Sequence, residues 1–169
     1  MILRDPHPRW FRQFVSAVRL NAKDVELWAI ADAHRGDVLA AAEACALHVR
    51  TVLGYRFEGA KHRILELEAC RRRGFGACGD ACAAIAAVVL MLDGECSLCY
   101  EQTRTLNSYA HVRMFVNGAY VDAFPDASLE VDRCAATEKV TRSGVRWPAT
   151  AETRARHLLD ERRRLAGPH

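Results

Sequence analysis

The stretch that most constrains the fold runs from Gly74 to Leu92, where a glycine-rich loop leads into an unbroken apolar segment. Residues 83–92 are apolar and include neither Pro nor Gly, and this predicts a buried helix. Cys78 falls at or just before the first turn of that helix. Unpaired backbone N–H groups and the positive end of the helix dipole favour an anion there, so a thiol at this position is biased toward thiolate. The alternative is a structural cysteine in a core helix.

Charged residues flank the predicted helix start. Arg71, Arg72 and Arg73 precede the glycine loop, and we expect them to add positive charge near the thiol. Asp80 falls in the first helical turn, where the helix dipole favours a carboxylate. Together these residues indicate the environment of a nucleophile.

The length and composition set the limits for the whole chain. Its 169 residues predict one domain, 1–169, with a helical part at about 8–73, a core at about 74–147 and a closing helix at about 148–165. A net charge of +3 is too small to indicate nucleic-acid binding. The longest apolar run is too short for a membrane span.

The cysteines and the first residues bear on the cellular compartment. Seven cysteines are an odd number, and residues 1–6 lack the apolar segment of a signal peptide. We therefore expect reduced thiols and a cytoplasmic protein. No pattern in the chain predicts a cofactor.

Helical patterns dominate the first part of the chain. Residues 8–20 place Trp10, Phe11 and Phe14 on one stripe, which predicts an amphipathic helix that docks on its own core, binds a protein partner or lies on a membrane surface. Further helices are predicted at 24–31 and at 38–53, the second capped by Asp37. Residues 55–73 leave helix and strand open, and His48 and His62 are interpreted as surface or core residues.

The pattern after the central helix favours strands, at 96–103, 109–116 and 119–124. Asn117-Gly118 between the last two is a strong hairpin signal. Two more short strands are predicted at 128–134 and 138–141. The chain is therefore expected to be α+β, with its helices packed on a small antiparallel sheet.

The hairpin can be read residue by residue. A two-residue turn puts Val116 opposite Ala119, so that His111 and Asp122 become diagonal neighbours on one face of the sheet. A carboxylate in that position can orient an imidazole and stabilise its protonated form, as a Cys–His pair requires. Asp126 is the second candidate, although Pro125 leaves its register open.

The order of cysteine, histidine and aspartate resembles that of the transglutaminase-like branch of the papain-like thiol enzymes. That family opens its core helix with G-x-C-x-D-x-A, and Gly76 to Cys82 follow this pattern with Cys82 in the place of the Ala. The family then has a histidine that opens an H-x-x-V-x-V strand, a short turn and an aspartate on the return. His111 to Val116, Asn117-Gly118 and Asp122 follow that plan, and small phage and bacterial members have this layout.

The resemblance implies a papain-like core with Cys78, His111 and Asp122 as a catalytic triad. The activity would be thiol-dependent acyl chemistry on a peptide or protein carboxamide, through a thioester. Water as the second nucleophile would make the protein a cysteine peptidase or deamidase, and an amine would make it a transglutaminase-like acyltransferase.

Two alternatives belong to other classes. Cys78, Cys82, Cys96 and Cys99 supply four thiols for a structural zinc site, although their spacing fits a helix face and a strand better than zinc-binding loops. The chain is otherwise a non-catalytic phage virion or assembly protein that retains the fold, with Trp10, Phe11 and Phe14 as its contact surface.

Overall fold

The computed structural model describes residues 8–58, 62–103, 109–125 and 131–167, which form helices and a small antiparallel sheet. This confirms the α+β class. The helices are α1 (Pro8–Asn21), α2 (Val25–Ala33), α3 (Val38–Val52), α4 (Leu67–Arg73), α5 (Cys78–Met91), α6 (Arg142–Val145) and α7 (Ala149–Ala166). The strands are β1 (Gly54–Tyr55), β2 (Phe75–Gly76), β3 (Cys96–Thr103), β4 (Tyr109–Val116), β5 (Ala119–Val121) and β6 (Val131–Val140).

The predicted helix boundaries agree closely with the structure because local caps fix them. Asp24 accepts hydrogen bonds from the backbone N–H groups of Glu26 and Leu27 at the start of α2. Asp37 does the same for Ala40 in α3. Gly74 ends α4 in the left-handed conformation, with φ 77°. The segment 55–73, for which the sequence left helix and strand open, contains the last residue of β1 and the helix α4.

The sheet has the strand order β5-β4-β3-β6, with antiparallel pairing throughout. The predicted hairpin register is confirmed, because Val116 pairs with Ala119, and Asn117 and Gly118 both have positive φ. The return arm is shorter than predicted and ends at Val121.

The prediction of two short strands after residue 128 is wrong. Residues 131–140 form one strand, β6, which pairs with β3 across two register shifts. No Gly or Pro interrupts this segment, and bulges let the pairing continue where two strands were expected. Residues 128–130 lie outside the described part of the chain.

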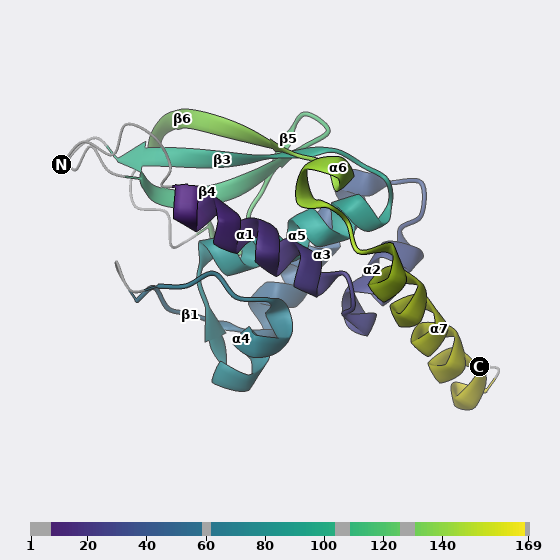
Figure 1. Cartoon of the computed structure of the whole chain (residues 1–169). Helices are drawn as coiled ribbons and strands as arrows, with labels where there is room; N and C mark the ends of the chain where they lie inside the picture. Colours follow the sequence, from purple (N-terminus) through teal and green to yellow (C-terminus); the bar gives the residue numbers. More distant parts are fainter. Residues whose placement is uncertain (1–7, 59–61, 104–108, 126–130, 168–169) are drawn as a thin grey trace.

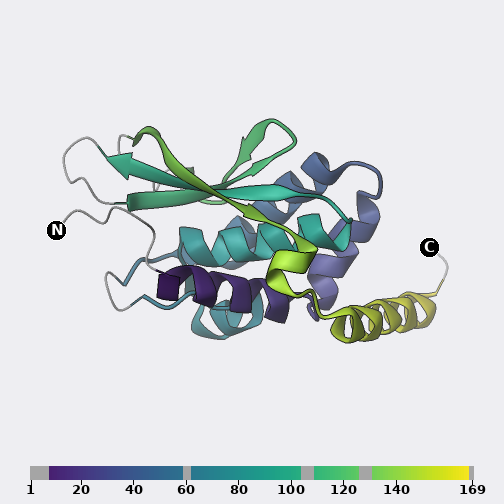
Figure 2. The ribbon, with the colours of Figure 1, turned by 45° about the horizontal axis from the view of Figure 1, so that its top comes forward.

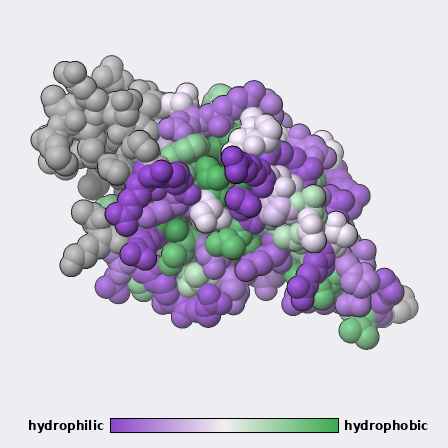
Figure 3. Space-filling model, in the orientation of Figure 1, coloured by the Kyte–Doolittle hydropathy of each residue, from purple (hydrophilic) through white to green (hydrophobic). Residues whose placement is uncertain are grey.

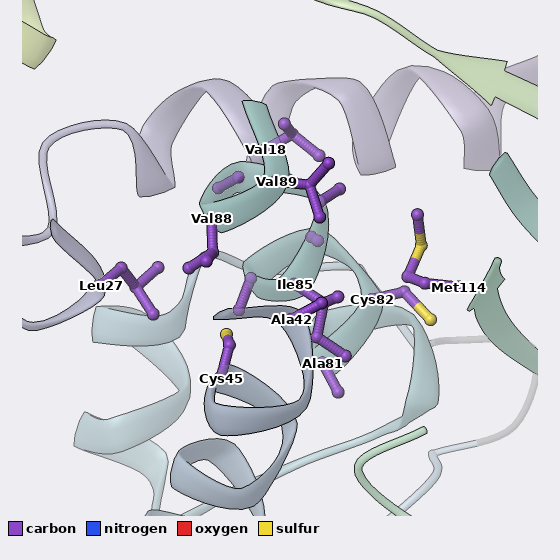
Figure 4. Packing of buried hydrophobic residues seen from close by; sticks show 14 of the residues in the cluster. Val18, Leu27, Ala42, Cys45, Ala81, Cys82, Ile85, Val88, Val89 and Met114 are labelled. Atoms are coloured by element: carbon purple, nitrogen blue, oxygen red, sulfur yellow. The ribbon is translucent and has the colours of Figure 1, made fainter. Parts of the chain in front are cut away.

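Helix α5 lies between the sheet and the other helices (Figure 1 and Figure 2). Every residue of α5 after Cys78 is buried. Side chains from α1, α2, α3 and β4 converge on it, as Val18, Leu27, Cys45 and Met114 show in Figure 4. Five alanines in α5 leave room for these neighbours to approach closely, which is why a helix of this composition is the centre of the core.

The aromatic stripe of α1 packs on the chain's own core. Phe14 is fully buried, and the Trp10 ring stacks on it at 6.2 Å and meets the Tyr100 ring edge-on at 5.6 Å. Phe11 is partly buried against the same core. The stripe therefore docks on the chain's own core, the first of the roles predicted for it. Trp10 and Phe11 keep part of their surface exposed, and a protein partner at this stripe stays a prediction.

The closing helix α7 extends from the body of the molecule (Figure 1). Its visible surface is mostly polar, with an apolar patch near its C-terminal end, where Leu165 is 89% exposed (Figure 3). Among the described residues, no helix has both the length and the apolar character needed to cross a bilayer.

One cysteine departs from the expectation of reduced thiols. Cys99 in β3 is disulfide-bonded, whereas Cys45, Cys70, Cys78, Cys82 and Cys96 are free. Cys99 therefore supplies no thiolate to a metal, and the described residues contain no group of three or more side chains arranged to hold one.

We predict that truncation in the centre of α5 destabilises the fold strongly. Ile85 is fully buried, so Ile85→Ala removes packed atoms and should lower the free energy of unfolding by about 2–5 kcal/mol. Leu165→Ala, at an exposed position, should change it by less than about 0.5 kcal/mol. Urea denaturation measures both, and equal effects would contradict the central position of α5.

Candidate active site

The first residue of α5 is Cys78, and a short parallel pairing of β1 with β2 holds the loop before it. Tyr55 lies opposite Gly76 in this pairing, and the Gly76 carbonyl accepts a hydrogen bond of 2.9 Å from the Arg56 N–H. Unlike the rest of α5, Cys78 is only partly buried. The thiol therefore lies at the predicted start of the helix and at the boundary between the core and the surface.

Gly79 lets α1 approach the first turn of α5. A Cβ at this position would lie 3.0 Å from the Trp10 ring and 3.2 Å from the Ile64 side chain. Only glycine fits without a shift of these neighbours. The placement of Cys78 thus depends on close packing directly beside it.

Asp80 fixes the same helix start by hydrogen bonding. Its buried carboxylate accepts hydrogen bonds from the backbone N–H groups of Ala77, at 2.7 Å, and Leu65, at 2.8 Å. One of its oxygens also lies 3.1 Å from Nε2 of His62, which is buried as well. Sequence reasoning assigned Asp80 to the helix dipole alone and gave His62 no role. In the structure, the two residues attach the segment before α4 to the start of α5.

The predicted pairing of His111 and Asp122 is present. Nε2 of His111 lies 2.6 Å from Oδ2 of Asp122, and the imidazole is almost completely buried. The other carboxylate oxygen accepts a hydrogen bond of 2.9 Å from the Phe124 N–H, so both oxygens are engaged. Asp126, the second candidate, lies outside the described residues.

His111 also interacts with Cys78. Burial by itself lowers the pKa of His111, but hydrogen bonds and charges from Asp122 and Cys78 outweigh it and raise the pKa to about 10. Nδ1 is buried and has no hydrogen-bond partner among the described residues. Since Asp122 holds Nε2, Nδ1 is the nitrogen left to face the thiol. The structure thus brings together the three residues that the sequence singled out.

A second carboxylate, Glu101, lies beside this group and was not predicted. It pairs with His111 across β3 and β4, is almost fully buried and forms an ion pair with Arg113. Burial raises the pKa of Glu101, while the positive charges of Arg113 and His111 oppose that shift. The available signal was a glutamate within a predicted strand, but its burial depends on the pairing of β3 on both sides.

Tyr55 is the other residue that sequence reasoning missed. Burial raises the pKa of its phenol, and the negative charges of Cys78 and Asp122 raise it further, which places the ring near both. Its ring meets the Phe124 ring edge-on at 5.2 Å. Tyr55 lies in the segment whose structure the sequence left open, so no pattern indicated it.

The arginines before the glycine loop do not act as expected. Arg71 binds Asp24 and Glu26, each at 2.7 Å, and Arg73 binds Glu58 at 2.6 Å. Arg72 lies 3.4 Å from Glu68. Because carboxylates offset these charges, the arginines are structural, and His111 is the cation that interacts with the thiol.

The remaining free thiols are core residues. Burial raises the pKa of Cys45, Cys70 and Cys82, and it raises the pKa of Cys96 to about 12. Cys82 donates a hydrogen bond of 3.5 Å to the carbonyl of Val112, which joins α5 to β4. Among the free cysteines of the described chain, Cys78 alone is not fully buried.

We predict that Asp122→Asn lowers the pKa of His111 by about 1–3 units, because the variant loses a carboxylate that stabilises the imidazolium. NMR titration of the imidazole measures this shift, with Asp160→Asn on the exposed side of α7 as the control. An unchanged titration in Asp122→Asn would contradict the assigned hydrogen bond.

The same shift makes stability depend on pH. The pKa of His111 is raised from 6.5 to about 10 in the folded state. The stabilisation of the fold by the protonated imidazole is therefore complete below pH 6.5 and is lost as the pH rises toward 10. The loss of unfolding free energy in Asp122→Asn should therefore be larger near the low end of this range than near the high end. Urea denaturation across the range tests this sign.

No family model, curated protein or solved structure matches the chain.

Proposed function

We propose that this protein is a thiol enzyme that carries out acyl chemistry with Cys78, His111 and Asp122. The observation that carries the proposal is the position of His111, which Asp122 holds at Nε2 while its buried Nδ1 remains for the thiol of Cys78. A protonated imidazole beside a thiol favours the thiolate, which is the reactive form. The substrate class is a peptide or protein carboxamide.

The first half of the reaction forms a thioester. The thiolate of Cys78 attacks the carboxamide carbon, and a tetrahedral intermediate with a negatively charged oxygen results. Backbone N–H groups in the first turn of α5 have no partner within the helix and can donate to this oxygen. The C–N bond then breaks, and the leaving amine takes the proton of the His111 imidazolium.

The second half releases the acyl group. Neutral His111 accepts a proton from the incoming nucleophile, which attacks the thioester carbon, and the bond to Sγ breaks. Water yields a carboxylic acid, as in a peptidase or deamidase, and an amine yields a new amide. Asp122 keeps the imidazole oriented through both halves.

The arrangement of elements supports a place in the transglutaminase-like branch of the papain-like enzymes. A helix that opens with cysteine packs on an antiparallel sheet, the histidine lies on one arm of a hairpin, and the aspartate directly follows the other arm. Fold alone does not establish activity, so the chemistry rests on the contacts of the three side chains.

We predict that iodoacetamide alkylates Cys78 rapidly at about pH 6.5 and that His111→Ala slows this by about 10- to 100-fold. An ordinary thiol has a pKa of about 8.5, so only about 1% is thiolate at that pH without an imidazolium partner. Site-resolved mass spectrometry measures each rate against pH. His157→Ala, which removes an exposed histidine from α7, should leave the rate unchanged.

The four other free cysteines serve as internal references, because all are buried in the native protein. If Cys78 reacts no faster than they do, or if His111→Ala has no effect, the proposed thiolate–imidazolium pair is wrong. The protein would then be better described as a non-catalytic descendant of the fold.

We further predict a trapped acyl-enzyme. A p-nitrophenyl ester should transfer its acyl group to Cys78 with release of nitrophenol, and intact mass should rise by that group in the wild type but not in Cys78→Ala. Hydroxylamine should then release the group as a hydroxamate and restore the original mass. Acylation at another residue would refute the assignment of Cys78 as the nucleophile.

A further inference from the structure

Tyr55 joins the two loops that carry the candidate active site. On one side it pairs in β1 with Gly76, two residues before Cys78. On the other side its ring contacts Phe124, whose backbone N–H binds the carboxylate of Asp122.

Tyr55 is not a simple core residue. Tyr55 is 41% exposed, whereas Phe124 behind it is 7% exposed. A buried ring thus supports a half-exposed ring at the edge of the site. Such an arrangement offers an aromatic surface to solvent at a fixed position, with little entropy left to lose when a ligand covers it.

The chemistry of this surface is apolar. In the described part of this loop, residues 122–125, the charged group is Asp122, and both of its oxygens are already engaged, by His111 and by the Phe124 N–H. The charge of nearby Arg56 lies over the Phe75 ring, at 4.8 Å from its centroid. A charged substrate side chain would therefore lose hydration against Tyr55 without gaining a partner.

We propose that the Tyr55 ring is a specificity-determining wall, which selects acyl donors with an aromatic side chain next to the attacked carbonyl. This inference rests on the proposed function and specifies its substrate class. The ring of the donor residue would pack on Tyr55 while its carbonyl meets Cys78. The phenol hydroxyl is not required for this role, so phenylalanine should replace tyrosine.

The test compares two affinity labels on the full-length protein, N-acetyl-phenylalanyl and N-acetyl-alanyl chloromethyl ketone. In each, Sγ of Cys78 forms a bond to the methylene carbon and chloride leaves. The measured quantity is the ratio of the two labelling rates at Cys78, because changes in the reactivity of the thiol cancel in that ratio. One aromatic contact should make the wild type react about 3- to 10-fold faster with the phenylalanyl label than with the alanyl label.

Variants then assign the preference to the ring. Tyr55→Phe should keep it, and Tyr55→Ala should reduce the ratio toward one. Tyr55→Gln, which keeps a side chain of similar length, should reduce it in the same way and covers the case in which the alanine variant is unstable. Phe115→Ala is the matched control, because it removes a half-exposed ring near the far end of β4.

The outcomes separate this inference from the proposed function. A reactive Cys78 without preference, or a preference that persists in Tyr55→Ala and Tyr55→Gln, overturns the role of Tyr55 and leaves the thiol chemistry in place. A Cys78 that reacts with neither label nor with iodoacetamide overturns the proposed function, and this inference with it.

Discussion

The close packing around α5 is the constraint on which the rest of the structure depends. A helix that is buried on all sides needs small side chains where its neighbours cross it. The alanines of α5 and Gly79 meet this need. The same packing fixes where the helix begins, because α1 and Ile64 close over its first turn. Cys78 is placed by this packing, and the arginines upstream contribute nothing direct to it.

Two aspartates stabilise the site in different ways, although each is paired with a histidine. Both oxygens of Asp80 accept backbone N–H groups, from Leu65 and Ala77, so its charge is used to hold the chain. Asp122 accepts one backbone N–H and gives its other oxygen to His111. Only the second arrangement leaves a carboxylate oxygen wholly for the imidazole, and only there does the histidine also interact with the thiol.

The sequence predicted what local patterns determine, and it missed what depends on distant partners. Caps at Asp24 and Asp37 and the Asn117-Gly118 turn act over a few residues, so helix boundaries and the hairpin register followed from them. The pairing of β6 with β3, the burial of Glu101 and the place of Tyr55 all depend on segments far apart in the chain. Sequence patterns alone contain no signal for such contacts.

The hairpin register controls the charges of the site as well as its geometry. His111 and Arg113 lie two residues apart on β4, where one meets Asp122 and the other Glu101, so each of these two carboxylates has a cation. Arg113 is also held from β5, because its guanidinium lies 3.8 Å from the centroid of the Tyr120 ring. A slip of one residue would turn every side chain of β5 to the other face. It would part His111 from Asp122 and move Tyr120 away from Arg113, so this one turn fixes an ion pair of the site and the aromatic contact that holds Arg113.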